Sequence, residues 1–201
     1  MTALPNECYY QIFNNLRHNH KNLFSCALVN RQWCRIIIPI LWSEPNRYFK
    51  DIRLIKIFLL TLNFEEQALL IPFKINLPNY PKPLFEYTNY ITSVDYKLYN
   101  GVRNWLRYER YKIENELVNA IVRSLTGMFL RTSKNLKYLK LNDYICDPII
   151  LGYLYENTTI TSIDISFKSK AIGGLVKILY KNSNLSTLNL TLIQLGSEDW
   201  Y

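Results

Sequence analysis

Thiol and imidazole side chains gather in the first part of the chain, where they could bind a metal ion. They are Cys8, His18, His20, Cys26 and Cys34. Zinc sites use both ligand types, usually with cysteines separated by only about two to four residues. No such cysteine pair occurs, and Cys8 and Cys26 fall on apolar helical stripes, where cysteine behaves as a small hydrophobic residue. We therefore expect reduced thiols, no metal site and no cofactor.

Motifs that carry out catalysis are missing from the sequence. It has no glycine-rich phosphate loop, no nucleophile elbow and no His-Glu-x-x-His zinc motif. The two histidines, which would be the natural general bases, lie almost beside each other in one polar segment. We therefore expect a binding protein with no catalytic residues rather than an enzyme.

A basic and aromatic segment at 103–112 could bind nucleic acid, because aromatic rings stack on bases and cations neutralise phosphates. The same composition fits a solvated helix face with its aromatic rings turned inward, and no nucleic-acid-binding motif surrounds it. We favour the solvated face and do not expect a nucleic-acid partner. The residues concerned are Arg103, Trp105, Arg107, Tyr108, Arg110, Tyr111 and Lys112.

The composition is that of a folded protein. The chain has 201 residues, of which 49% are hydrophobic, and 24 Lys and Arg against 16 Asp and Glu give a net charge of +8. This excess favours acidic partners without specifying one. The longest apolar runs, 36–42 and 57–62, are far shorter than the roughly 18 residues of a membrane span. We expect a soluble protein of the cytoplasm or nucleus with no membrane partner.

Helix signals dominate the region 4–42. Pro5 suits a first helical turn, and Glu7 favours the positive end of the helix dipole. A polar break at 17–22 precedes a second helical segment, and we expect Pro39 to end a third. A unit of this size buries too little apolar surface to be stable alone. We therefore expect it to pack against a partner. The apolar stripe of the first helix is formed by Cys8, Ile12 and Leu16.

The order of residue types in this region resembles the F-box. The matching landmarks are Leu4, Pro5, Glu7, Ile12, Phe13, Leu16, Leu23, Cys26, Leu28, Val29, Asn30, Arg31, Trp33, Leu41 and Trp42, whereas Cys8 and Tyr9 stand where the family usually has leucines. The resemblance implies three helices that dock on a Skp-family adaptor and through it on a cullin–RING ligase. It also implies that Trp33 and Trp42 hold the helices together. By position, the adaptor-binding residues would be Leu4, Pro5, Glu7, Ile12, Phe13, Leu16, Leu28 and Val29.

Helical spacing continues over 47–71, which we expect to be a helical connector. Asn63 and Glu66 have the spacing of an N-cap residue and its reciprocal acid. Four prolines between 72 and 83 then rule out a helix, so we expect an extended linker at 72–90 and a domain boundary there.

A repeat governs the second half of the chain. Each copy has three aliphatic residues at strand spacing followed by a helical stretch, and the copies are offset by 24 and 25 residues from position 136 to 160 and 185. A more irregular copy begins at Ile91, with an insert at 98–112 and a return helix near 113–128. The period resembles that of leucine-rich repeats. The aliphatic sets are Leu136, Leu139 and Leu141, then Ile160, Ile163 and Ile165, then Leu185, Leu188 and Leu190, and the last helix carries Leu175, Val176 and Leu179.

Residues between the strand leucines should point away from the core, because side chains alternate along a strand. They are polar and of mixed charge, which suits a surface that recognises a protein substrate. The candidate substrate-binding residues are Tyr138, Lys140, Asn142, Ser162, Asp164, Thr187 and Asn189, with Ser166 and Thr191 on the same side.

These patterns predict an α/β protein. Its parts are an F-box at 1–46, a connector at 47–71, a linker at 72–90 and, at 91–201, a short leucine-rich-repeat solenoid that is incomplete at its C-terminus, with parallel strands and helices on the convex side. An ordinary α-helical core at the N-terminus and a plain α/β domain after it stay open as alternatives. The resemblance implies a substrate adaptor of an SCF-type ubiquitin ligase. A scaffold acting outside ubiquitination and a basic nucleic-acid-binding protein are the alternatives.

Overall fold

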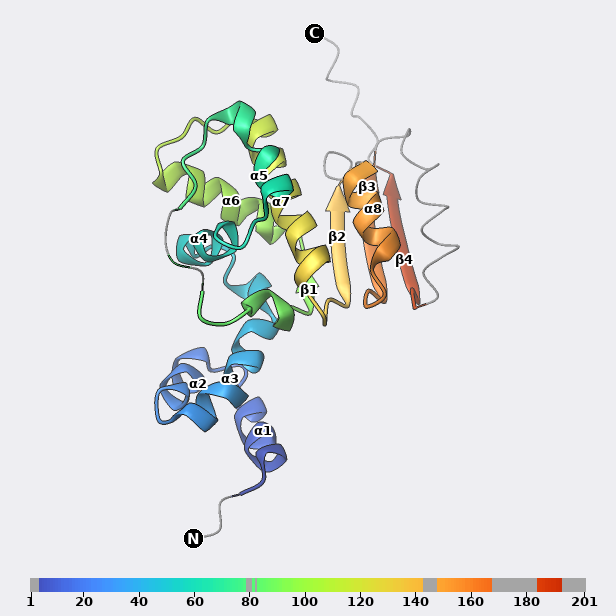
Figure 1. Ribbon diagram of the computed structural model, residues 1–201. Helices are drawn as coiled ribbons and strands as arrows, with labels where there is room; N and C mark the ends of the chain where they lie inside the picture. Colours follow the sequence, from blue (N-terminus) through green and yellow to red (C-terminus); the bar gives the residue numbers. More distant parts are fainter. Residues whose placement is uncertain (1–3, 79–80, 82, 143–147, 168–183, 193–201) are drawn as a thin grey trace.

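The structure is a computed structural model that describes residues 4–78, 81, 83–142, 148–167 and 184–192. Figure 1 shows a small helical unit at the N-terminal end, joined to a larger body that combines helices with one parallel sheet. The expectation of helices followed by a parallel α/β arrangement is therefore confirmed at this level. Cys146 and the helix expected around Leu175, Val176 and Leu179 lie outside the described residues.

Three helices form the N-terminal unit: α1 (Asn6–Asn15), α2 (His20–Ala27) and α3 (Arg31–Ser43). Asparagine residues cap the N-termini of two of them. The Asn19 side chain accepts a hydrogen bond from the backbone N–H of Asn22, and the Asn30 side chain accepts one from the backbone N–H of Trp33. The second helix thus begins at His20, inside the segment 17–22 that we expected to be a break.

The core of this unit is small. The Trp33 ring packs edge-on against Phe13, with 5.0 Å between the ring centroids, and Tyr9 lies beside both. This places Trp33 among the three helices, as the F-box resemblance implies. The buried residues of this core are Phe13, Leu23, Ala27, Ile37 and Ile40.

Pro39 does not end the third helix, contrary to our expectation. Helix α3 continues through Pro39 to Ser43, although a proline removes one backbone hydrogen bond of the helix. Burial on both sides of the proline offsets that loss, because Ile37 and Ile40 lie in the small core while Trp42 packs on the larger body. The helix therefore links the two parts of the molecule.

Trp42 serves this link rather than the three-helix core. Its indole stacks on Tyr87 at 4.0 Å between centroids and meets Phe58 edge-on at 6.0 Å. The backbone N–H of Thr92 donates to the carbonyl of Ser43 at the end of α3. The N-terminal unit is thereby joined to the start of the sheet.

The connector contains the short 3₁₀ helix η1 (Pro45–Arg47), helices α4 (Ile52–Leu59) and α5 (Phe64–Ala68), and the 3₁₀ helix η2 (Ile71–Phe73). The expected cap is present, since Asn63 and Glu66 exchange side-chain and backbone hydrogen bonds at 2.8 Å each. Glu66 is 3% exposed and also pairs with Arg131, with 2.8 Å between Oε1 and Nε. This ion pair ties the connector to the helix that carries Arg131.

The segment 72–90 holds only the end of η2 and the 3₁₀ helix η3 (Tyr87–Tyr90) among its described residues. Side chains from before and after it share one core, in which Phe58 meets Phe129 edge-on at 4.9 Å. A domain boundary within 72–90 stays a prediction.

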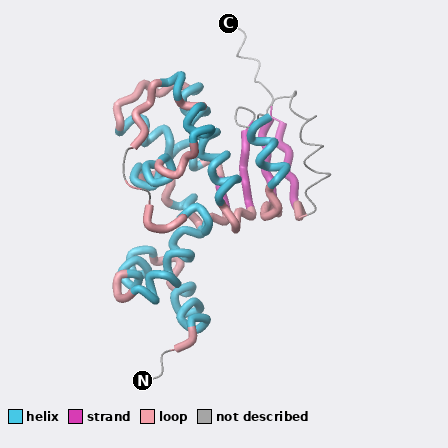
Figure 2. Tube along the Cα trace, viewed as in Figure 1, coloured by secondary structure: helices cyan, strands magenta, loops and turns pink. Residues whose placement is uncertain are grey.

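Among the described residues, four parallel strands form one sheet in the order β1 (Ser93–Val94), β2 (Tyr138–Asn142), β3 (Ser162–Phe167) and β4 (Thr187–Leu192) (Figure 2). Helices α6 (Lys97–Tyr108) and α7 (Asn115–Thr132) lie between β1 and β2 in the chain, and α8 (Pro148–Glu156) lies between β2 and β3. Each strand therefore pairs with the next one along the chain, as expected for repeats.

The register of the strands is the one that the repeat alignment predicts. Leu139 pairs with Ile163, Ile163 pairs with Leu188, and Val94 of the irregular first copy pairs with Leu139. Leu139 and Ile163 are fully buried, and Leu188 packs partly buried against the same core. Leu190 differs from its counterparts, because it is 45% exposed on the last described strand, with no described strand beyond it.

Backbone hydrogen bonds repeat from strand to strand where each strand begins. The carbonyl of Thr92 accepts from the backbones of Lys137 and Tyr138, and that of Lys137 accepts from Thr161 and Ser162. The carbonyl of Thr161 accepts likewise from the next strand. The copies thus share one local geometry, not only an aliphatic pattern.

Candidate functional sites

Large apolar side chains are exposed on the N-terminal unit. Leu4 and Ile12 are each 49% exposed, while Leu28 and Val29, in the turn before α3, are 72% and 61% exposed. Pro5, Glu7 and Cys8 are exposed beside them on the first turns of α1. Six of the eight predicted adaptor-binding residues are therefore open to solvent.

A hydrogen bond brings the two exposed segments together. The side-chain amide of Gln32 donates to the Asn6 side chain at 2.9 Å, so the first turn of α3 lies beside the first turn of α1. Leu4 and Pro5 immediately precede one helix, and Leu28 and Val29 precede the other by a few residues. We refer to Leu4, Pro5, Ile12, Leu28 and Val29 as the apolar rim.

Phe13 and Leu16 do not belong to this surface. Phe13 is only 2% exposed because its ring fills the centre of the three-helix core, so its expected contact with a partner stays a prediction that this burial does not support. Leu16 is partly buried against the same core. Sequence reasoning missed Tyr10 and Phe24, which are 46% and 56% exposed. Helical spacing could have identified Phe24, since Leu23 and Ala27 point inward and Phe24 is turned away from both.

The sheet has one open face, which carries the predicted substrate-binding residues. Lys140 Nζ and Asp164 Oδ2 are 2.8 Å apart, and the Tyr138 hydroxyl donates to the same oxygen at 3.4 Å. The Asp164 carboxylate raises the pKa of Lys140 through this hydrogen bond, whereas burial is the main cause that raises the pKa of Tyr138. The sequence pattern did not reveal the pair, although the strand register places the two residues opposite each other.

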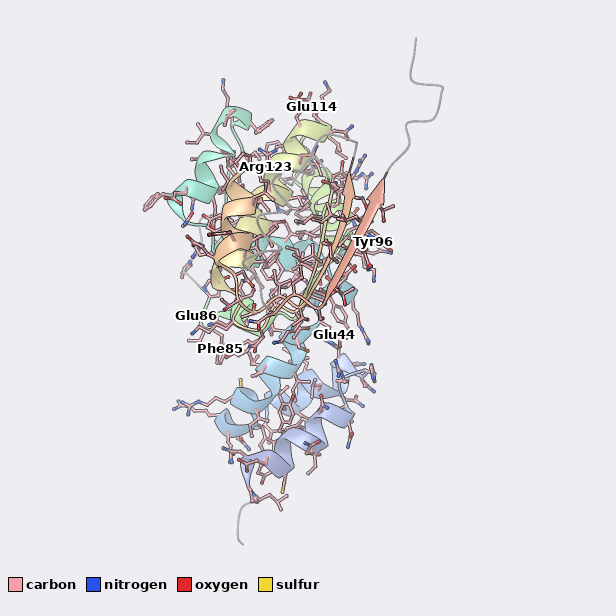
Figure 3. All side chains as sticks on the ribbon, turned by 90° about the vertical axis from the view of Figure 1, so that its right-hand side faces the viewer. Glu44, Phe85, Glu86, Tyr96, Glu114 and Arg123 are labelled. Carbon is pink, nitrogen blue, oxygen red and sulfur yellow. The ribbon has the colours of Figure 1, made fainter. Side chains whose placement is uncertain are left out.

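The other predicted residues of this face are accessible. Thr187, Asn189 and Thr191 on β4 are exposed, and Asn142 and Ser162 are partly buried. The side chains of Leu139 and Ile163 point to the opposite side, where α7 and α8 contribute to the core. Figure 3 shows α8 lying along that side of the strands. Alternation along the strands thus separates a core face from an open polar face, as expected.

The basic segment 103–112 is mostly a helix surface. Trp105 is 1% exposed, and Tyr111 packs partly buried on the core, with its hydroxyl oxygen accepting from the backbone of Asn76. Tyr108 departs from the expectation, because it is 61% exposed with the Lys56 ammonium 4.8 Å from its ring centroid. Two of the three rings are therefore turned inward, which removes them from stacking on bases.

The described residues contain neither a cluster of candidate metal ligands nor a helix that could span a membrane. No group of three or more His, Cys, Asp or Glu side chains among them is arranged to hold a metal ion. Cys8, Cys26 and Cys34 are free thiols. In the same part of the chain, no helix combines the length and the apolar character needed to cross a bilayer.

Comparison with known proteins assigns the N-terminal unit. Residues 1–48 match the family described as F-box-like. No curated protein and no solved structure gives a significant match to the chain. The first three helices with their apolar rim therefore form an F-box-like domain at the start of the chain.

Proposed function

We propose that this protein is the substrate-recognition adaptor of an SCF-type ubiquitin ligase. The F-box-like domain docks on a Skp-family adaptor, which connects it to a cullin–RING ligase. The larger body holds a protein substrate on the open face of its sheet, and the chain carries out no reaction of its own. The match of residues 1–48 to the F-box-like family is the observation that carries the proposal.

The apolar rim supports docking on energetic grounds. Leu4, Ile12, Leu28 and Val29 are each about half exposed or more. Burying the exposed half of such a side chain gains roughly 1 kcal/mol, so the four together contribute several kcal/mol before the costs of association. A domain of this size otherwise leaves these groups in water. A partner with a complementary apolar groove removes them from it.

Leucine-rich repeats are the second element of the proposal. The parallel register and the repeated backbone bonds support it. Asparagine side chains add a further repeated contact, because Asn135 donates to the carbonyl of Asn89 and Asn184 donates to that of Thr158. Each asparagine lies one residue before the first core residue of its own copy, and the carbonyl that it contacts lies two residues before the first core residue of the preceding copy. Such stacking gives a sheet whose open face can bind a protein.

The adaptor acts by proximity. A substrate held on the sheet and a ligase held on the F-box-like domain raise the local concentration of substrate lysines near the conjugating enzyme. The proposal includes a cytoplasmic or nuclear location, which the free thiols of Cys8, Cys26 and Cys34 support.

Stepwise reconstitution tests the proposal. The purified full chain is mixed with a Skp-family adaptor and then with a cullin–RING complex, and the masses of the eluted species are measured by light scattering after gel filtration. We expect one complex that contains all components. An adaptor complex that never recruits the cullin would instead support a scaffold outside ubiquitination, and elution of the chain alone would overturn both functions.

A further inference from the structure

A cavity opens where the first strand of the sheet stops short. Strand β1 ends at Val94, which pairs with Leu139, whereas β2 continues to Asn142. The chain leaves the sheet to begin α6 at Lys97, so the last three residues of β2 have no β1 partner. The space beside them, bounded by α6 and α7, is a cavity of about 690 Å³. Ligands commonly bind beyond the carboxyl ends of parallel strands.

The walls of this cavity combine apolar and polar groups. Leu98, Val122 and Leu141 provide apolar surface, and Asp95, Glu116 and Asn119 provide oxygen atoms that accept hydrogen bonds. Tyr96, labelled in Figure 3, is 60% exposed and also lines the cavity. The volume lies within the range of about 300 to 1,000 Å³ that is typical of binding pockets.

The charge around the cavity is acidic, although the chain as a whole has a net charge of +8. Lys140, on β2, lines the cavity and carries a positive charge. The Asp164 carboxylate neutralises that charge, with 2.8 Å between Lys140 Nζ and Asp164 Oδ2. Asp95 directly follows Val94, the last residue of β1, and lines the cavity. Its carboxylate is 3.9 Å from the Lys97 ammonium, and Glu116 has no ion pair among the described residues.

Asn119 adds an acceptor that lacks a donor. Its side-chain oxygen is buried and has no hydrogen-bond partner within the described part of the chain. Buried polar atoms are nearly always paired, and leaving one unpaired is costly. Asn119 lines the cavity, so a bound group that reaches this oxygen with a donor would satisfy it.

We propose that this cavity binds a lysine or arginine side chain of the protein substrate. The inference rests on the proposed function and specifies one chemical group of the substrate that the larger body recognises. The aliphatic stem lies against Leu98, Val122 and Leu141, and the cationic head donates to Asn119 and faces Glu116. An acidic side chain would instead be repelled by the carboxylates of Asp95 and Glu116. The cavity is larger than one side chain, so residues next to the cation also contact it.

Peptide binding tests this proposal with the full chain. The probes are fluorescein-labelled pools of short peptides with randomised uncharged positions around one fixed residue, which is Lys, Arg, norleucine or Glu. Fluorescence anisotropy should show binding of the Lys and Arg pools that exceeds that of the norleucine and Glu pools by at least about tenfold. Equal binding of all pools would overturn the proposal.

Two variants locate the binding. Glu116→Arg should weaken binding of the Lys and Arg pools by at least about tenfold, and Asn119→Leu should do the same without a change of charge. Glu114→Arg is the matched control, because this substitution makes the same change in net charge as Glu116→Arg. Glu114 lies two residues from Glu116 and does not line the cavity. If Glu114→Arg weakens binding as much as Glu116→Arg, the attraction is general and the cavity is not the site.

A separate titration with the Skp-family adaptor distinguishes the two proposals. Glu116→Arg should leave adaptor binding unchanged, because the cavity lies on the larger body and the apolar rim on the F-box-like domain. Selective peptide binding without adaptor binding would overturn the proposed function and leave the cavity as a site for basic side chains. Adaptor binding without selective peptide binding would overturn only the inference.

Discussion

The two parts of the molecule treat apolar side chains in opposite ways. The F-box-like domain buries a small core around Phe13 and leaves Leu28 and Val29 more than half exposed. The larger body buries a continuous core from Phe49 to Ile165, and its open sheet face is polar. The first part therefore presents an apolar surface and the second presents hydrogen-bonding groups and charges.

This difference indicates two kinds of partner. Apolar surface on a small, marginal domain suits a stable association that contributes to its folding. A polar face on a well-packed sheet suits recognition through hydrogen bonds, with little change in the sheet itself. The difference therefore fits the proposed function, in which a constant partner binds at one end of the chain and a selected substrate at the other.

Phe13→Ala should have the largest effect on stability, and it should stay within the F-box-like domain. The ring is 2% exposed and packs against Trp33, so its removal should cost about 3 to 5 kcal/mol. Hydrogen exchange should show α1 and α2 losing protection while β2 and β3 keep theirs. Equal loss of protection in the sheet would show that the two cores unfold as one.

Leu139→Ala should destabilise the larger body by about 2 to 5 kcal/mol, because the side chain is fully buried between neighbouring strands. Thr187→Ala is the control on the open face and should change the free energy of unfolding by less than about 0.5 kcal/mol. Chemical denaturation measures both values. Similar costs for the two variants would contradict the assignment of core and open faces.

Arg131→Met should cost about 2 kcal/mol, because it leaves the Glu66 carboxylate buried without its cation. The arginine is itself partly exposed, so the cost is below that of a fully buried pair. Arg107→Met removes an exposed guanidinium and should be nearly neutral. Thermal unfolding of both variants checks the difference, and an unchanged melting temperature in Arg131→Met would show that the ion pair is not needed to hold the connector.

A smaller effect should follow from pH. Burial against Tyr48, and then the nearby charge of Arg47, lower the pKa of His20. The folded state therefore binds its proton less readily than the unfolded state, so this contribution to stability is present above about pH 6.5 and is lost as the pH falls. The protection factors of the α2 amides, which correct for the intrinsic slowing of exchange in acid, should fall on acidification, and His20→Gln should reduce that fall. An identical pH response in the variant would exclude His20 as its cause.

Much of the fold follows from local sequence patterns. The strand register could be predicted because the aliphatic triplets recur at a nearly constant offset, and the cap at Asn63 and Glu66 because it depends on residues three apart. The helix through Pro39 could not, since tertiary burial on both sides of the proline outweighs its local preference.

The candidate sites were predicted less completely than the fold. Sequence matching cannot tell an exposed aromatic from a buried one, which is why Phe13 was placed on the docking surface. The alternation of side chains along each strand identified the open face. The Lys140–Asp164 ion pair, however, depends on the strand register, and the cavity depends on the early end of β1. These features join residues that are distant in the sequence and have no local signal.

The central claim is that the apolar rim is the docking surface for a Skp-family adaptor, and calorimetric titration of that adaptor into the full chain tests it most directly. The double variant Leu28→Ala, Val29→Ala should weaken binding by at least about tenfold. Phe64→Ala is the control, because Phe64 is 91% exposed but lies on the connector. Our account predicts normal affinity for the control, and unchanged affinity in the double variant would contradict it.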